Sequence, residues 1–188
     1  MAIMNSEARF GALAKLFHWG MAALILGLIG LGLYMHELPL SPRKFELYAL
    51  HKSLGATALG LALLRIGWRA VNKPPASLPD IPAEQVKLAA LAHWALYGCM
   101  LALPLSGWLM ASASGTPVDL FNSGLLLPTL VGADDDLRIA FRLLHDLIGK
   151  LLMVLIAIHV GAALKHHFID KDATLRRMLP WGRTDGGA

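Results

Sequence analysis

Four long stretches of mainly apolar residues divide the chain, and polar segments separate them. The stretches run from about residue 16 to 35, 47 to 68, 88 to 112 and 144 to 167. A helix needs about 20 apolar residues to cross a bilayer core of about 30 Å, and each stretch meets that length. The pattern therefore predicts an all-α integral membrane protein, a four-helix bundle that forms a single domain over residues 1–188.

The polar segments between these spans predict how the chain is oriented in the membrane. Lys and Arg concentrate in short cytoplasmic loops. The side that would hold both termini is richer in them, so we expect both termini, and the tail 168–188, to be cytoplasmic. The longest loop, residues 113–143, would then lie outside. The basic residues of the outer side are Arg43, Lys44, Lys52, Arg138, Arg142 and Lys150.

Composition narrows the class of function. Hydrophobic residues make up 56% of the chain and charged residues only 16%, against about 25% charged in a soluble domain. The net charge of +4 fits basic cytoplasmic loops, and we expect no nucleic-acid partner. A single Cys excludes an internal disulfide framework and a Cys-ligated metal cluster, whereas eight His are unusual in so apolar a chain.

Two histidines of the fourth span face the same way at opposite depths. His145 and His159 are fourteen residues apart, which is about 21 Å and just under four turns of a helix. We expect a partner at each depth on another span, His51 for His145 outside and His18 for His159 inside. Two imidazoles from opposing helices suit bis-histidine haem, since zinc would usually want carboxylate or thiolate ligands as well.

Glycines one turn after two of these histidines favour the same interpretation. His51 is followed by Gly55 and His145 by Gly149, at the same spacing. A glycine at this position leaves room on the ligand face for a flat macrocycle. The alternative is close helix packing through small residues, which is common in membrane bundles.

Other polar residues near the spans leave alternatives open. Arg65, fourteen residues after His51, is expected either to neutralise inner haem propionates or to snorkel to the headgroups. Arg142 is one turn before His145 and is expected to serve the outer haem or to attract an anion. His93 is a competing inner ligand, a quinone contact or a structural residue. Pro104 with Gly107 is most simply a kink in the third span.

Several segments together resemble the bacterial cytochrome b561 family, the four-helix di-haem membrane proteins that include superoxide oxidase. The resemblance covers nearly the whole chain, and the tail is its most specific part. The matching segments are Phe17-His18-Trp19, His51-x-x-x-Gly55, Ala102-Leu103-Pro104-Leu105-Ser106-Gly107, the pair His145 and His159, and the tail His166-His167-Phe168-Ile169-Asp170-Lys171-Asp172-Ala173-Thr174-Leu175-Arg176-Arg177-Met178-Leu179-Pro180.

The resemblance implies two b haems, the bacterial inner membrane, and electron exchange with ubiquinone. It further implies a superoxide:ubiquinone oxidoreductase. From their position on the outer side, we expect Lys52, Arg43, Lys44, Arg138 and Arg142 to form a basic funnel for the superoxide anion, with Lys52 and Arg142 as the catalytic residues. Because quinone reduction consumes protons, the candidate quinone contacts are His166, His167 and His93; the alternative for His166 and His167 is an interfacial polar end of the fourth span. The alternative is a haem-bearing membrane anchor that passes electrons between quinone and a peripheral redox partner protein, a dehydrogenase or hydrogenase.

Overall fold

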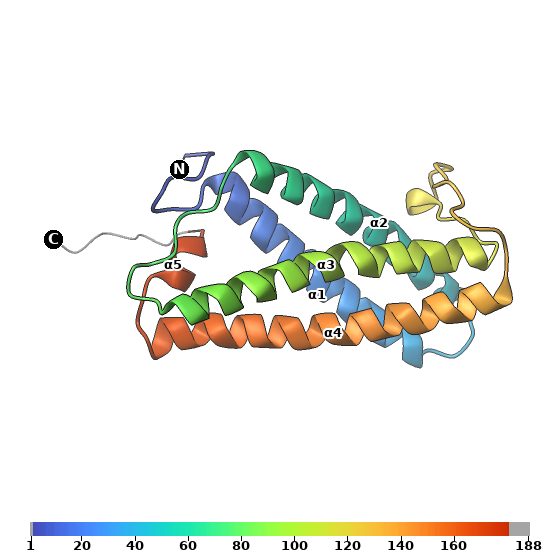
Figure 1. Cartoon of the computed structure of the whole chain (residues 1–188). Coiled ribbons are helices and arrows are strands. Elements are labelled where there is room, and N and C mark those ends of the chain that lie inside the picture. Colours follow the sequence, from blue (N-terminus) through green and yellow to red (C-terminus); the bar gives the residue numbers. More distant parts are fainter. Residues whose placement is uncertain (1, 181–188) are drawn as a thin grey trace.

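The computed structural model describes residues 2–180, and over these residues it is helical with no β-strand. Its regular elements, drawn in Figure 1, are α1 (Ala12–Glu37), α2 (Pro42–Val71), α3 (Ala83–Ala113), the 3₁₀ turn η1 (Leu120–Asn122), α4 (Asp135–Phe168) and α5 (Thr174–Met178). The helices α1 to α4 are each long and apolar enough to cross a membrane. The predicted all-α membrane fold is therefore confirmed.

The helix α4 begins before the apolar stretch that predicts its span. It starts at Asp135, nine residues before that stretch, so the last nine residues of the expected outer loop 113–143 are helical. The Asp134 side chain accepts a hydrogen bond from the Leu137 backbone N–H at 2.9 Å and caps the helix. Asp135 and Asp136 occupy the first turn, where carboxylates favour the positive end of the helix dipole.

The helix α2 also begins before its apolar stretch, and for a similar reason. The Ser41 hydroxyl accepts a hydrogen bond from the Lys44 backbone N–H at 3.3 Å. Pro42 follows as the first helical residue, a position where the missing N–H costs nothing. Capping residues thus extend both helices beyond the span that hydropathy alone predicts.

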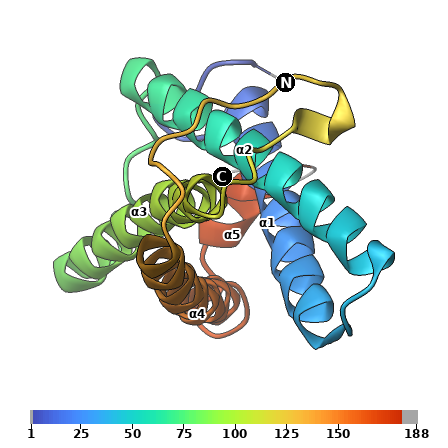
Figure 2. The same ribbon diagram turned by 90° about the vertical axis from the view of Figure 1, so that its right-hand side faces the viewer.

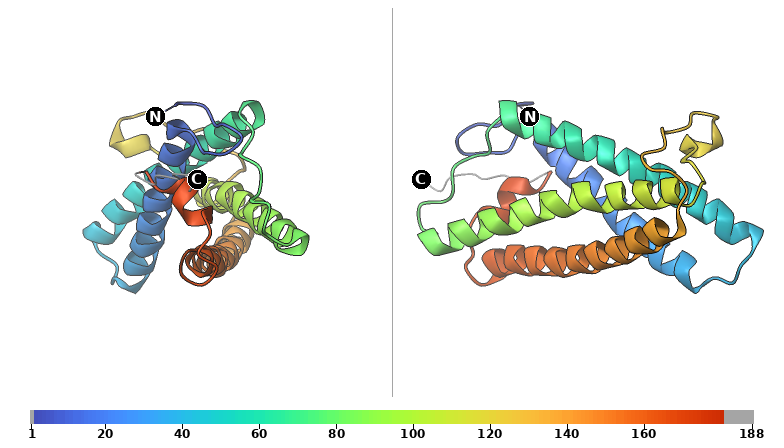
Figure 3. Two further views of the ribbon diagram at one scale, coloured as in Figure 1. Left: turned by 90° about the vertical axis from the view of Figure 1, so that its left-hand side faces the viewer. Right: turned by 45° about the vertical axis from the view of Figure 1, so that its right-hand side comes forward.

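The four long helices form two hairpins, α1 with α2 and α3 with α4, and the hairpins meet where α2 packs on α3. The end-on views show α1 and α4 on the outside of this arrangement, splayed apart (Figures 2 and 3). The helix α5 and the described N-terminal segment share one end of the bundle, which we call the termini end. The segment 114–134 covers the opposite end, the loop end.

A buried serine attaches the loop-end segment to α2. The Ser53 side chain is fully buried, and its hydroxyl accepts a hydrogen bond from the Phe121 backbone N–H at 2.9 Å. The hydroxyl proton is shared between the Ala49 carbonyl at 3.0 Å and the Asp119 carbonyl at 3.2 Å. Phe121 and Asn122 both have φ of 54°, a left-handed conformation that non-glycine residues rarely adopt. The loop is therefore held in one conformation two residues from His51.

A buried arginine joins three distant segments at the termini end. The Arg177 side chain is 9% exposed, and its guanidinium donates to the Ala8 carbonyl at 2.8 Å and to the Ala76 carbonyl at 3.0 Å. Burial lowers the pKa of this guanidinium below its ordinary value, yet the group remains cationic because that ordinary value is above about 12. One side chain thereby connects α5 to the N-terminal segment and to the α2–α3 connection.

We expect Arg177→Lys to destabilise the termini end, because a single ammonium cannot reproduce two divergent guanidinium bonds. A buried carbonyl left without a donor costs about 1–3 kcal/mol, and each kcal/mol lowers Tm by roughly 2–4 °C in a chain of this size. Thermal unfolding of the detergent-solubilised protein measures the change. Arg176→Lys is the matched control, since Arg176 is exposed; an equal loss in both variants would contradict the assignment.

Candidate functional site

The structure brings the four predicted ligand histidines together in two pairs at opposite ends of the bundle. At the loop end the ring centroids of His51 and His145 lie 6.3 Å apart. At the termini end the centroids of His18 and His159 lie 6.1 Å apart. Each pair joins the α1–α2 hairpin to α4, and both rings on α4 face the same side of that helix.

These separations suit one metal ion between two imidazoles. A metal–imidazole bond is about 2.0 Å and the nitrogen lies about 1 Å from its ring centroid, so two axial imidazoles place their centroids roughly 6 Å apart. The two imidazoles of each pair come from helices on opposite sides of the bundle, α4 on one side and α1 or α2 on the other. The donor set also fits haem iron, which accepts axial imidazole ligands.

The loop-end pair has one ring held by hydrogen bonds. The Nδ1 of His145 lies 3.1 Å from the Leu103 carbonyl and 3.0 Å from the Ser106 hydroxyl. The Ser106 hydroxyl donates to the same Leu103 carbonyl at 2.7 Å, so its oxygen is free to accept from His145. Since a carbonyl can only accept, Nδ1 carries the proton, and Nε2 keeps the lone pair that a metal requires.

Two glycines lie against the rings of this loop-end pair. A Cβ atom on Gly107 would lie 3.2 Å from Cε1 of His145 and 3.4 Å from its Nδ1, tighter than ordinary contact. A Cβ atom on Gly32 would lie 3.5 Å from Cε1 of His51, at ordinary van der Waals distance. Gly107 therefore permits the observed position of His145, a role distinct from the predicted kink; α3 continues as a helix through Pro104.

The second ring of the loop-end pair has an unsatisfied nitrogen. Nδ1 of His51 is buried and has no hydrogen-bond partner in the described part of the chain. A buried polar atom without a partner costs free energy. This arrangement fits an imidazole whose partner is a group outside the polypeptide.

The termini-end pair is surrounded by further polar residues. His93 places its ring centroid 5.4 Å from that of His159, so the structure retains it as a neighbour of the pair. The Arg65 guanidinium lies 3.4 Å from Nδ1 of His18, as its register with His51 predicted. Arg65 also lies over the ring of the buried Tyr97, at 5.5 Å from its centroid, and Arg69 lies over the same ring at 5.6 Å.

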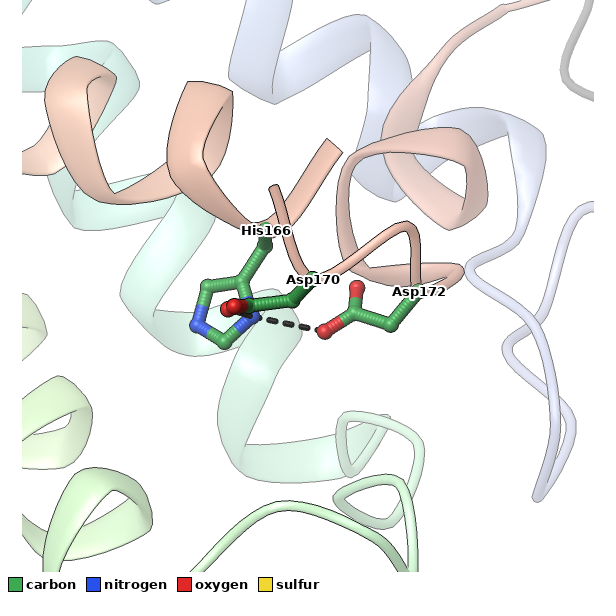
Figure 4. A group of neighbouring side chains, drawn as sticks. All are labelled: His166, Asp170 and Asp172. Atoms are coloured by element: carbon green, nitrogen blue, oxygen red, sulfur yellow. Dashed lines mark hydrogen bonds and ion pairs between the residues drawn. The ribbon is translucent and has the colours of Figure 1, made fainter. Parts of the chain in front are cut away.

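His18, His93 and His159 do not converge on a single ion. Within the described residues, the group of His, Cys, Asp and Glu close enough for one metal ion is His166, Asp170 and Asp172. Figure 4 shows these side chains where the chain leaves α4. Nδ1 of His166 lies 2.6 Å from the Asp172 carboxylate and 3.2 Å from that of Asp170.

The carboxylates of this His166 cluster already have partners among the described residues. Asp170 already pairs with the Lys165 ammonium at 2.6 Å. Burial raises the pKa of Asp172, but hydrogen bonds from the Thr174 backbone N–H and the His166 ring outweigh it and lower that pKa overall. The adjacent His167 differs, because its buried Nδ1 has no partner in the described structure.

The predicted anion-attracting residues lie beside the loop-end pair. Lys52 follows His51 directly and is half-buried, whereas Arg142 is exposed one turn before His145. Neither forms an ion pair within residues 2–180, in contrast to Arg43, which pairs with Glu46 at 3.1 Å. The structure thus leaves both charges uncompensated at the loop end.

The two predicted macrocycle glycines are unobstructed. A Cβ on Gly55 would meet nothing within 4 Å, and one on Gly149 would meet only Leu103 Cδ1 at 3.9 Å. An alanine side chain at either position would therefore not clash with a neighbouring helix. Their role in making room for haem stays a prediction.

Sequence reasoning missed three residues around the histidines. Ser106 is buried and contacts His145. Tyr97 is also buried, and Arg69 lies over its ring together with Arg65. Arg69 lies one turn after Arg65 on α2, so a shared helix face was the available signal. The hydrogen bond of Ser106 to a histidine on another helix had no local signal.

The sequence pattern described as prokaryotic cytochrome b561 matches residues 9–181 of the chain. The chain belongs to this family. It is 37% identical over its whole length to the full length of cytochrome b561 homolog 2 of Escherichia coli K12. It is 38% identical to cytochrome b561 homolog 1 of the same organism over 56% of this chain and 59% of that protein.

A third relative has a name that states an activity. The probable superoxide oxidase CybB of Yersinia pestis is 32% identical over 74% of this chain and 80% of that protein. Family membership makes this cytochrome a multi-pass bacterial membrane protein that binds b-type haem. The predicted resemblance to the cytochrome b561 family is confirmed.

We expect Gly107→Ala to weaken haem binding at the loop end, because the added methyl displaces the His145 ring from its hydrogen bonds. The haem-to-protein ratio of the purified variant should fall from that of the wild type toward loss of one site. Gly98→Ala is the control: it lies on the opposite face of α3 by helical register, and its Cβ would meet nothing within 4 Å. Equal haem content in both variants would contradict this role.

Proposed function

We propose that this cytochrome carries two b haems and transfers electrons from superoxide outside the cell membrane to ubiquinone. One haem would lie between His51 and His145 at the loop end, the other between His18 and His159 at the termini end. The observation that carries the proposal is the presence of two imidazole pairs at metal-bridging separation, about four helical turns apart on α4. When bound, such haems supply reversible one-electron chemistry.

The orientation in this proposal places the loop end outside and the termini end in the cytoplasm of a bacterial inner membrane. The basic residues at the termini end support it, since cytoplasmic loops are rich in Lys and Arg. The bundle then forms one domain, with a histidine pair near each membrane surface. A path between the surfaces is what transfer across the membrane requires.

At the loop end, Lys52 and Arg142 would attract the superoxide anion. Both charges lack a carboxylate partner in the described structure. Lys52 directly follows His51, and Arg142 lies one helical turn before His145. Positive charge around a small site raises the encounter rate with anions. The name of the Yersinia pestis relative supports superoxide as this anion.

At the termini end, His166 and His167 would form the ubiquinone site. Nδ1 of His167 is buried without a partner in the described structure, so it is available to hydrogen-bond a quinone oxygen. Nδ1 of His166 lies 2.6 Å from the Asp172 carboxylate, which fixes the orientation of the His166 ring. The two histidines would thus offer a quinone one unpartnered ring nitrogen and a second imidazole of fixed orientation.

The ligand assignment predicts a specific loss of haem. His145→Ala and His51→Ala should each remove one of two haems and leave the other, measured by visible spectra and haem-to-protein ratio. His93→Ala should keep both, because His93 lies beside the termini-end pair as a neighbour. Retention of two haems in His145→Ala, or loss of one in His93→Ala, would overturn the pairing.

The activity predicts reduction by superoxide without a partner protein. In stopped-flow spectroscopy, the purified cytochrome should be reduced by superoxide at near the diffusion limit. The double variant Lys52→Gln and Arg142→Gln should slow this step by roughly a few-fold to tenfold and weaken its dependence on salt. Arg43→Gln, whose charge is already paired with Glu46, should have a smaller effect.

The same experiment separates the alternative function. A haem-bearing anchor subunit would pass electrons between quinone and a peripheral enzyme. Reduction by quinol or by a partner protein, with no reaction toward superoxide, would support that function and reject the superoxide activity.

A further inference from the structure

The two histidine pairs have different electrostatic surroundings. At the termini end, a cationic side chain touches the pair: the Arg65 guanidinium lies 3.4 Å from Nδ1 of His18. At the loop end, neutral acceptors touch the pair: the Leu103 carbonyl and the Ser106 hydroxyl lie 3.1 and 3.0 Å from Nδ1 of His145. The protein thus offers positive charge to one pair and electron-rich oxygen to the other.

The positive charge at the termini end is fixed in place. Tyr97 is 8% exposed, and the guanidinium groups of Arg65 and Arg69 lie 5.5 and 5.6 Å from its ring centroid. The Trp94 ring holds Arg69 from another side at 5.9 Å. The His18 ring centroid lies 6.1 Å from that of His159, which in turn lies 5.4 Å from that of His93.

The acceptors at the loop end are fixed as well. Ser106 is 2% exposed, and its hydroxyl proton is committed to the Leu103 carbonyl at 2.7 Å. Both oxygens therefore accept from the same Nδ1–H, which makes the imidazole a stronger electron donor through its other nitrogen. The nearest carboxylate in sequence, Asp146, also acts on the His145 ring.

These surroundings act on a bound iron with opposite signs. Nearby positive charge stabilises an added electron, and the interaction is strong where the surroundings are apolar. A ligand made more basic by hydrogen bonding stabilises the oxidised metal instead. The loop-end cations weaken this contrast less. Arg142 is exposed to solvent, where its charge is screened, and within the described residues no contact joins Lys52 to either ring of the loop-end pair.

We propose that these residues set the order of the two midpoint potentials, lower at the loop end and higher at the termini end. The inference rests on the proposed haem ligand pairs and adds what directs the electron between them. With haem bound at both pairs, this order would direct an electron released by an outer donor, such as superoxide oxidised to dioxygen, from the loop-end pair toward the termini-end pair. Arg65, Arg69 and Tyr97 act at the receiving end, Ser106 and the Leu103 carbonyl at the donating end.

A redox titration of the haem-loaded full chain, followed by visible spectroscopy, tests this order. Wild-type protein should titrate in two waves. His145→Ala should lose the wave of lower potential and retain the higher one. Loss of the higher wave would overturn the inference while leaving the ligand pairs intact. Retention of both haems would instead overturn the ligand pairs.

Substitutions that leave the ligands in place test the individual residues. Arg65→Gln should shift the termini-end wave to lower potential, and Ser106→Ala should shift the loop-end wave to higher potential, each without moving the other wave. Ser106→Thr keeps the hydroxyl and should restore the wild-type value. The matched controls are Lys87→Gln, at an exposed cation of the termini end, and Ser114→Ala, at the exposed residue that follows α3.

Equal shifts of both waves in Arg65→Gln, or a downward shift in Ser106→Ala, would overturn the assigned roles. Haem content and the positions of the absorption bands, measured on the same samples, show whether each variant is folded and loaded. A purely structural role for Ser106 would lower haem content in the Ala and Thr variants alike, and that result also overturns the inference.

Discussion

A bilayer has no water to solvate a polar side chain, so each imidazole inside it must find a partner. In this cytochrome the requirement falls on rings that face one another from opposing helices, His18 toward His159 and His51 toward His145. The packing of the four long helices is consistent with these pairs. Two hairpins pack through α2 and α3, and each pair of rings joins α4 to the α1–α2 hairpin.

The helix α3 contributes no ligand to the proposed pairs, yet it determines their surroundings. Near the loop end it supplies Ser106, Gly107 and the Leu103 carbonyl, which position the ring of His145. Toward the termini end it supplies the ring of Tyr97, over which two arginines of α2 lie. Because it packs against both α2 and α4, one helix controls both sites.

The two ends of the bundle are closed by different means. A buried serine of α2 holds the loop-end segment, whereas the buried Arg177 joins α5 to two other segments at the termini end. Hydrogen bonds to backbone carbonyls and N–H groups make both connections. Each of these connections lies close in sequence to a proposed functional residue. Ser53 is near the haem-ligand candidate His51, and α5 is near His166 of the proposed quinone site.

The sequence by itself determined the class of fold and the positions of the ligand candidates. Apolar stretches of membrane length can only be helices in a bilayer, and a separation of fourteen residues places His145 and His159 on one face whatever surrounds them. Hydropathy does not predict where α4 starts, because the start depends on capping by Asp134 in a polar segment.

Contacts between helices were decided only by the tertiary structure. The register of α3 against α4 brings Ser106 and Gly107 to His145, and the packing of α2 on α3 brings Arg65 and Arg69 to Tyr97. The structure likewise separated His166, which is held by Asp172, from His167, whose Nδ1 is unpartnered in the described residues. A helical period states which way a side chain points along its own helix, but only the packing of two helices decides what it meets.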